Sequence, residues 1–264
     1  MTTYPVANAP HIRSTDSIAR YFWMKNAALF PILAAAVWTG GFDFIRILAL
    51  SVGGSLGFEW LSRGFSRKKT TLLNGDTFLT GLTLALLLPE RSSLPHVLIA
   101  VFMAVVVVRE CFGGTGNYIV HPAIFGRVFL DAVFPVSAGS PVLFRCAAEP
   151  LMLTAIVLSA VCFLAQRRIY FETPFYYITI YLLAAFMLGG GSKALTHAGV
   201  AVFTAFFLVT DPVVLPLTRQ GTNVFVLLAA FFAGIFGLWY PAVTAVGYAI
   251  LIVNMLVPWI NDRM

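Results

Sequence analysis

Residues 113–127, GGTGNYIVHPAIFGR, lie between two strongly apolar runs, LPHVLIAVFMAVVVV (94–108) and VFLDAVF (128–134). Glycine accepts backbone conformations that other residues avoid, and Pro122 lacks a backbone N–H group. Non-helical backbone at membrane depth is tolerated only where it is buried in protein or lines a polar cavity. The stretch therefore predicts a helical membrane protein with an irregular element where two helices meet.

The composition extends this interpretation to the whole chain. Of the 264 residues, 59% are hydrophobic and 11% are charged, and the mean hydropathy is +0.88. Soluble domains carry about 25% charged residues, so the class indicated is an all-α polytopic membrane protein. Residues 1–26 are polar and basic and lack the apolar core of a cleavable signal peptide.

Hydropathy and Gly/Pro punctuation predict about ten membrane spans, several of them short. They cover residues 27–42, 44–62, 73–89, 95–112, 123–143, 149–166, 174–191, 196–215, 223–239 and 241–260. An even number of spans places both termini on one side, where 13 of the 17 Lys and Arg residues also fall. The positive-inside rule then predicts cytoplasmic termini in a bacterial-type cytoplasmic (inner) membrane. Topology thus explains the net charge of +6, and we expect no nucleic-acid partner.

Ten spans divide as five plus five, which makes an internal duplication an inverted one. The third span ends FLTGLTLALLLPE and the eighth ends VFTAFFLVTDP, with small or hydroxyl residues early and a proline late in both. Inverted repeats commonly form a site near the midplane, where helices break. The predicted organisation is a cytoplasmic N-terminal segment, a first five-helix half, a connecting loop, a second half and a cytoplasmic C-terminus (1–26, 27–143, 144–148, 149–260 and 261–264).

The polar break at 113–127 is one candidate site. Gly113, Gly114 and Gly116 allow positive φ and close approach of a ligand, and Pro122 can open the next helix at its first turn. Exposed amides there can face an anion or a carbonyl-rich ring. The alternative is an ordinary turn between helices.

A second break, LVTDPVVLPLTRQGTN, covers residues 208–223. Asp211 precedes a proline at the end of the eighth span, Pro216 prevents easy resumption of the helix, and Thr218 precedes Gly221. An Asp before Pro often caps a turn. The functional alternative is a broken element that contacts an ion or a cofactor.

Few ionisable residues fall inside the predicted spans. Asp131 follows Arg127 by four residues, so it is either the structural partner of that arginine or part of an ion path. Glu110 is a further ion-path candidate, although with Arg109 it is expected to extend to the membrane interface. Asp76 is expected to cap the third span.

The cysteines and histidines are scattered. Three Cys and four His show no C-x-x-C pair and no H-x-x-x-H spacing. We therefore expect no metal site, disulfide framework or iron–sulfur cluster within this chain, while a haem held by two different helices stays an alternative. No nucleotide-binding motif or catalytic triad is present, so no catalytic residue is assigned.

Four stretches carry a resemblance to a known family. They are LLNGDTFLTGLTLALLLPE (72–90), VVVVRECFGGTGNYIVHPAIFGRVFLDAVFP (105–135), FFLVTDPVVLPLTRQG (206–221) and VNMLVPWIND (253–262). With them the chain resembles the NqrB/RnfD membrane subunits of the sodium-pumping NADH:quinone oxidoreductase and of the Rnf ferredoxin:NAD oxidoreductase. The resemblance implies a urea-transporter-like bundle of two inverted five-helix halves and flavin-linked electron transfer coupled to ion movement.

One departure concerns a covalent cofactor. Family members carry FMN linked to the Thr of an S-G-A-T type motif in a long loop after the fifth span. Here that region is only VSAGSPVLFRCAAEP (136–150), which contains no threonine. We expect no covalent FMN, with Ser140 the one weak substitute, besides Ser137.

A second departure lies in the opening stretch. The family pattern G-x-N-x-x-N-P becomes residues 116–122, where Tyr118 and His121 replace the two asparagines. In relatives this loop lies near a non-covalent riboflavin, so Tyr118 is expected to stack on the flavin ring (riboflavin or FMN) and His121 to donate to a carbonyl. The alternative is an empty pocket. The full predicted set of cofactor ligands is Gly113, Gly114, Gly116, Asn117, Tyr118, His121, Pro122, Arg127 and Thr218.

The resemblance implies an integral membrane subunit of an Rnf/Nqr-type complex that supports flavin- or quinone-linked electron transfer coupled to proton or sodium translocation. Its partners would be other Rnf/Nqr-type membrane subunits, a cytoplasmic flavin or iron–sulfur subunit, an outer-side electron carrier and the lipid bilayer. The alternatives are a cofactor-free ion or solute channel and a structural scaffold. The predicted ion-path residues are Asp131, Glu110 and Asp211.

Overall fold

The computed structural model describes residues 17–67, 70–134, 140–166 and 170–264, without the side chains of 188–196. Within these ranges the chain forms helices and turns and no strand, which confirms the all-α class. Within the described part of the chain, three helices are long and apolar enough to cross a membrane, and three shorter helices are also apolar. The chain is therefore a helical membrane protein.

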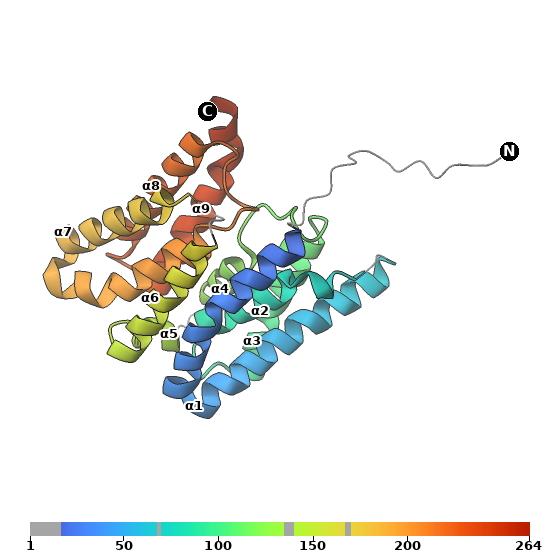
Figure 1. Cartoon of the computed structure of the whole chain (residues 1–264). Helices are drawn as coiled ribbons and strands as arrows, with labels where there is room; N and C mark the ends of the chain where they lie inside the picture. The colour runs from blue at the N-terminus through green and yellow to red at the C-terminus, as the bar shows by residue number, and fades with distance from the viewer. Residues whose placement is uncertain (1–16, 68–69, 135–139, 167–169) are drawn as a thin grey trace.

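The first helix, α1 (Ile18–Phe65), consists of two limbs joined at Gly41. Gly41 has φ 58° and ψ −144°, which is not helical, and the chain reverses there, so that the two limbs run back past each other (Figure 1). These limbs match the predicted spans 27–42 and 44–62. The helix begins nine residues earlier than the first predicted span, because the Ser17 hydroxyl accepts a hydrogen bond from the Arg20 N–H group at 3.1 Å and caps it.

Helix α7 (Glu172–Phe203) also folds back on itself. The Tyr181 hydroxyl lies 3.2 Å from Nδ1 of His197. In a straight helix, residues 16 positions apart are separated by about 24 Å. The reversal therefore falls between these two residues, an interval that includes the boundary predicted for the seventh and eighth spans.

The remaining elements are short or single helices. They are η1 (Leu72–Asn74), α2 (Asp76–Leu87), α3 (Leu94–Phe102), η2 (Met103–Glu110), α4 (Pro122–Val133), α5 (Val142–Arg145), α6 (Pro150–Ala165), η4 (Thr204–Leu208), α8 (Arg219–Phe236) and α9 (Ala242–Arg263).

Two helices end earlier than the spans predicted for them. The fifth, 123–143, ends at Val133, because Phe134 precedes a proline and leaves the helical region with φ −126° and ψ 70°. The eighth, predicted to reach residue 215, ends at Leu208, because Pro212 cannot donate a helical hydrogen bond.

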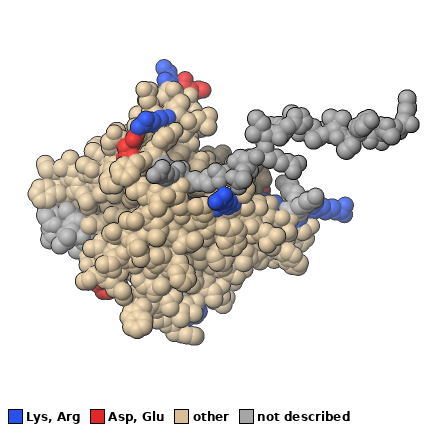
Figure 2. All heavy atoms as spheres, viewed as in Figure 1, with Lys and Arg blue, Asp and Glu red and all other residues tan. Residues whose placement is uncertain are grey.

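The helices pack as one bundle with a lipid-like exterior. Helix α1 packs against α2, α3 and α6, α8 packs between α7 and α9, and α4 contacts α9. Figure 2 shows a broad surface band without Lys, Arg, Asp or Glu, with charged residues toward its edges. Large apolar side chains such as Trp38, Phe42 and Phe30 are 82%, 79% and 71% exposed. Such a surface is stable in hydrocarbon and not in water.

Candidate functional site

Two widened helical turns lead into the two polar breaks. In η2 the Cys111 N–H group donates to the Val106 carbonyl at 3.0 Å, and in η4 the Val209 N–H group donates to the Thr204 carbonyl at 2.9 Å. These i→i+5 bonds define π-helical turns, which are rare and often occur at functional sites. The glycine loop (residues 111–121) follows η2, and the Asp211 loop (residues 209–218) follows η4.

The backbone of the glycine loop has the predicted conformation. Gly113, Gly114 and Gly116 have φ values of 110°, 93° and 89°. A Cβ atom on Gly114 would clash with Nη2 of Arg63, so at this position the close approach is to an α1 side chain. Helix α4 begins at Pro122, which confirms its predicted first-turn position.

Arg109, at the end of η2, is fully buried. Its Nε atom lies 2.9 Å from Asp76 Oδ2, and its Nη1 atom lies 3.4 Å from Glu59 Oε2. It also donates hydrogen bonds to Thr77 and, at 2.8 Å, to Thr115. The prediction that Arg109 reaches the membrane interface was wrong, because two buried carboxylates hold it inside.

Arg63 joins this network from the second limb of α1. Its Nε atom lies 3.1 Å from Glu110 Oε2 and 3.4 Å from Glu59 Oε1. The side chains of Arg63 and Glu110 are only 7% and 6% exposed, so Glu110 lies inside the protein. The predicted cap at Asp76 was wrong, since Gly75 occupies the capping position and the Asp76 carboxylate contacts Arg109.

Asp211 lies against the glycine loop, so the two polar breaks predicted from the sequence, 113–127 and 208–223, are in contact. The Tyr118 hydroxyl donates to Asp211 Oδ2 at 3.4 Å, and His121 Nε2 lies 3.6 Å from the same oxygen. The Val213 N–H group donates to Oδ1 at 3.2 Å. Nδ1 of His121 accepts from the Ile124 N–H group at 3.5 Å, so the proton of a neutral imidazole is on Nε2 and faces Asp211.

Burial keeps both loop side chains neutral. Burial lowers the pKa of His121 to about 4, which the Asp211 carboxylate opposes and the Lys25 ammonium reinforces. Burial, followed by the nearby Asp211 charge, raises the pKa of Tyr118 well above its usual range. At neutral pH, Asp211 therefore faces two uncharged donors.

Lys25, on the first limb of α1, is the last charged residue of this buried group. It is 1% exposed, and its ammonium interacts electrostatically with Asp211 and Asp76. Its Nζ atom lies 5.9 Å from the centre of the Phe163 ring and, among the described residues, has no hydrogen-bond acceptor. We name the whole set the polar cluster: Lys25, Glu59, Arg63, Asp76, Arg109, Glu110, Tyr118, His121 and Asp211.

The sequence interpretation missed part of this cluster. Glu59 and Arg63 are four residues apart, inside and just after the predicted span 44–62, which is the spacing of a helical ion pair. An intramembrane carboxylate such as Glu59 is itself a signal of function. Lys25 gave a weaker signal, since it lies two residues before the first predicted span, 27–42.

Arg127 and Asp131 form a separate pair on α4. Arg127 Nη2 lies 2.9 Å from Asp131 Oδ1, which confirms the predicted i, i+4 contact. The Thr244 hydroxyl of α9 donates to Asp131 Oδ2 at 2.8 Å, so this pair also joins α4 to α9.

The other predicted residues are placed as follows. Thr218 caps α8, accepting from the Gly221 N–H group at 3.0 Å. Asn117 and Ser140 are exposed. Ser137 lies outside the described residues. Within the glycine loop, Gly113 and Gly116 are exposed, whereas Tyr118 and His121 point inward.

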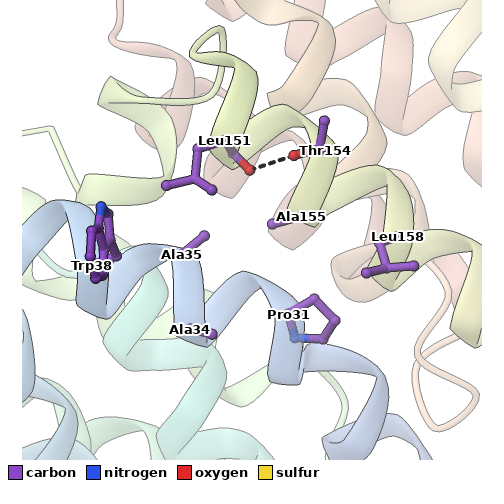
Figure 3. A pocket seen from close by; sticks show the side chains of 8 residues that line it. All are labelled: Pro31, Ala34, Ala35, Trp38, Leu151, Thr154, Ala155 and Leu158. Carbon is purple, nitrogen blue, oxygen red and sulfur yellow. Dashed lines mark hydrogen bonds between the residues drawn. The ribbon is translucent and has the colours of Figure 1, made fainter.

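An apolar groove of about 660 Å³ lies between α1 and α6 (Figure 3). Its lining is Pro31, Ala34, Ala35, Trp38, Leu151, Thr154, Ala155 and Leu158. The Thr154 hydroxyl is already bonded to the Leu151 carbonyl at 2.9 Å. The groove contains none of the predicted cofactor ligands, and its lining offers little to orient a polar ring.

Comparison with known proteins matches the chain to one family model over nearly its full length. The model of the NQR2, RnfD, RnfE family matches residues 5–146 and 144–264. The two matches meet at the predicted connecting loop, 144–148.

Three relatives align with almost the entire chain. A subunit of the ion-translocating oxidoreductase complex of Methanosarcina acetivorans is 28% identical, with 99% of this chain and 95% of that protein covered. A subunit of the proton-translocating ferredoxin:NAD(+) oxidoreductase complex of Clostridium ljungdahlii is 24% identical (98% and 93%), and its Na(+)-translocating counterpart from Acetobacterium woodii is 25% identical (97% and 92%). Each alignment is longer than this chain, so these relatives carry insertions that it lacks.

Proposed function

The chain belongs to the NQR2, RnfD, RnfE family, and on this premise we propose that it is the membrane subunit of an Rnf-type complex that couples electron transfer to proton or sodium movement. The observation that carries this proposal is its full-length similarity to subunits of ion-translocating oxidoreductase complexes. Other subunits of the complex would supply electron donor chemistry: further membrane subunits, a cytoplasmic flavin or iron–sulfur subunit and an outer-side carrier.

We propose that the polar cluster forms part of the ion path. Its support is the convergence of Tyr118, His121 and the Val213 amide on Asp211, with Glu110 in the adjoining network. Buried ionisable groups in membrane helices are costly and commonly mark such paths. Asp131 is proposed as a further step, on α4.

The glycine loop fits a flavin only in part. Tyr118 and His121 do not fit the expected ring-stacking and carbonyl-donating roles, because their polar atoms are directed at Asp211. Gly113, Gly116 and Asn117 are exposed and can present backbone and amide groups. We therefore propose that a non-covalent flavin, riboflavin or FMN, is held at this exposed part of the loop, where it would supply one-electron redox chemistry. Covalent FMN is not part of the proposal.

Flavin content tests the redox role. The purified complex would be acid-denatured, the released flavin quantified, and the intact mass of this chain measured. A released flavin that is lost in an Asn117→Ala complex, with an unmodified chain mass, supports the proposal. A mass increase of one FMN would contradict it and direct attention to Ser140 or Ser137. No flavin in either fraction would leave this subunit an ion path or scaffold.

A cofactor-free ion path or scaffold is the second candidate. It is favoured by one observation, the inward orientation of Tyr118 and His121 toward a carboxylate. The flavin measurement separates it from the first candidate. Ion flux through the assembled complex then separates a path from a scaffold.

We also propose ten membrane helices in two inverted halves, with both termini cytoplasmic in the inner membrane. The reversals within α1 and α7 support the count, because each contributes two limbs. Cys111 is exposed at the start of the glycine loop and provides a native reporter of orientation. A membrane-impermeant maleimide should label Cys111 in inverted vesicles and not in intact cells, with Cys111→Ser as the control. Labelling in intact cells would reverse the orientation.

A further inference from the structure

Lys25 is a buried cation that interacts electrostatically with two carboxylates. It lies on the first limb of α1 and is 1% exposed. The next residue, Asn26, donates a hydrogen bond to the Gly75 carbonyl at 3.0 Å, which places this turn of α1 beside Asp76. The ammonium interacts electrostatically with Asp211 and Asp76. Its other side is covered by the Phe163 ring of α6, 5.9 Å from Nζ. Within the described part of the chain, Nζ has no hydrogen-bond acceptor, so the ammonium is not fixed in place as the two arginines are.

The charges of the polar cluster do not balance. It contains four carboxylates, those of Glu59, Asp76, Glu110 and Asp211. Three cations face these carboxylates, namely Lys25, Arg63 and Arg109. His121 adds no charge at neutral pH, because burial lowers its pKa to about 4. A net negative charge in a buried site is costly. Counted over the described residues, the cluster is one positive charge short of neutrality.

Among the described residues, Asp211 is the carboxylate of the polar cluster that has no guanidinium partner. Glu59, Asp76 and Glu110 each have an arginine nitrogen within 3.4 Å. Among the described residues, the groups that contact Asp211 are the Tyr118 hydroxyl, the His121 ring and the Val213 amide, all neutral. A cation that enters this position gains a carboxylate and a phenolic oxygen as ligands.

We propose that Lys25 is a tethered cation that competes with one transported monovalent cation, a proton or Na⁺, for Asp211 and Asp76. When the cation is bound, the ammonium is displaced toward Phe163; when it leaves, the ammonium compensates Asp211. The ammonium thus lowers the affinity of the site and favours release. This inference deepens the proposed ion path and rests on it.

The test uses the intact complex reconstituted in vesicles, with the Lys25→Met variant. Two quantities are measured during ferredoxin-driven NAD reduction: cations moved per electron pair, and the cation concentration for half-maximal rate. Na⁺ is varied at fixed pH in one arm, and pH is varied without Na⁺ in the other, which identifies the cation. Arg20→Met is the matched control, because Arg20 is an exposed cation on the same limb of α1.

We expect Lys25→Met to lower the half-saturating cation concentration at least tenfold and to reduce cations moved per electron pair, while Arg20→Met changes neither. Wild-type affinity and stoichiometry in Lys25→Met, or equal changes in both variants, would overturn the proposal. If wild-type vesicles move no ion, the proposed function itself fails, which is a different result.

A second variant covers the case in which Lys25→Met does not assemble. Lys25→Met combined with Asp211→Asn removes one charge of each sign and restores the net charge of the cluster. We expect the double variant to assemble and to move no coupled ion. If both variants fail to assemble equally, Lys25 has only a packing role and the proposal is refuted.

Discussion

Arg109 is the residue whose loss should most damage the polar cluster. It is fully buried and contacts Asp76 at 2.9 Å and Glu59 at 3.4 Å. Glu59 retains Arg63 at 3.4 Å when Arg109 is removed, but Asp76 loses the guanidinium that contacts it. Arg109→Met therefore leaves a buried carboxylate without its ion-pair partner.

The expected cost is about 3–5 kcal/mol, the usual loss when one partner of a buried ion pair is removed. At roughly 2–4 °C per kcal/mol for a chain of this size, the unfolding midpoint should fall by about 6–20 °C. Arg219→Met is the matched control, because Arg219 pairs with Glu172 while 61% exposed. Exposed pairs contribute about 0–1 kcal/mol.

Cys146 provides the readout, because it is only 4% exposed and reacts with thiol reagents on unfolding. Its alkylation in the purified complex would be quantified by mass spectrometry across a temperature ramp. Arg109→Met combined with Asp76→Asn should recover part of the loss, since it removes the stranded charge. A midpoint no lower than that of Arg219→Met, or no recovery in the double variant, would refute the reasoning.

Three further predictions follow from local geometry. Gly114→Ala should destabilise the folded protein by about 1–3 kcal/mol, because φ is 93° at this position and the new Cβ atom would meet Arg63. The control Gly57→Ala has open space around it and should be neutral or stabilising. Both are measured in the same alkylation assay. Asp131→Asn should lower transported ions per electron at least tenfold in an assembled complex, and an unchanged ratio would remove Asp131 from the path. Because the pKa of His121 is about 4 when folded and 6.5 otherwise, the unfolded chain binds more protons between these values. The free energy of unfolding should therefore fall by about 1.4 kcal/mol per pH unit as the pH drops from 6.5 to 4. Alkylation midpoints measured across this pH range should show the slope in the wild type and not in His121→Gln.

The elements that the sequence predicted well are those set by local chemistry. Proline at 122 acts on the backbone of its own neighbours, so the start of α4 could be placed from that residue. The boundary predicted between the spans 27–42 and 44–62 lies two residues from the reversal at Gly41. The Arg127–Asp131 pair follows from one helical turn. The same local reasoning located both polar breaks, although the fifth and eighth helices end earlier than hydropathy suggests.

The pairing of charges could not be predicted in this way. Arg109 and Glu59 are 50 residues apart, and Tyr118 and Asp211 are 93 residues apart. These contacts exist because α1, η2 and the two loops meet in the bundle, and a single sequence does not specify which helix ends meet. Arg109 was consequently assigned to the interface, although an arginine near a helix end can equally turn inward when carboxylates lie there.

The buried cations also change what the count of basic residues means for orientation. The structure describes eight of the thirteen residues on the predicted cytoplasmic side, and four of these eight are buried, namely Lys25, Arg63, Arg109 and Arg127. The positive-inside rule concerns basic residues in the loops that flank the spans, so side chains enclosed by carboxylates carry little topological information. Without them the bias is nine to four, which still favours cytoplasmic termini. The orientation therefore depends on the flanking basic residues, while the buried cations are required by the carboxylates that they neutralise.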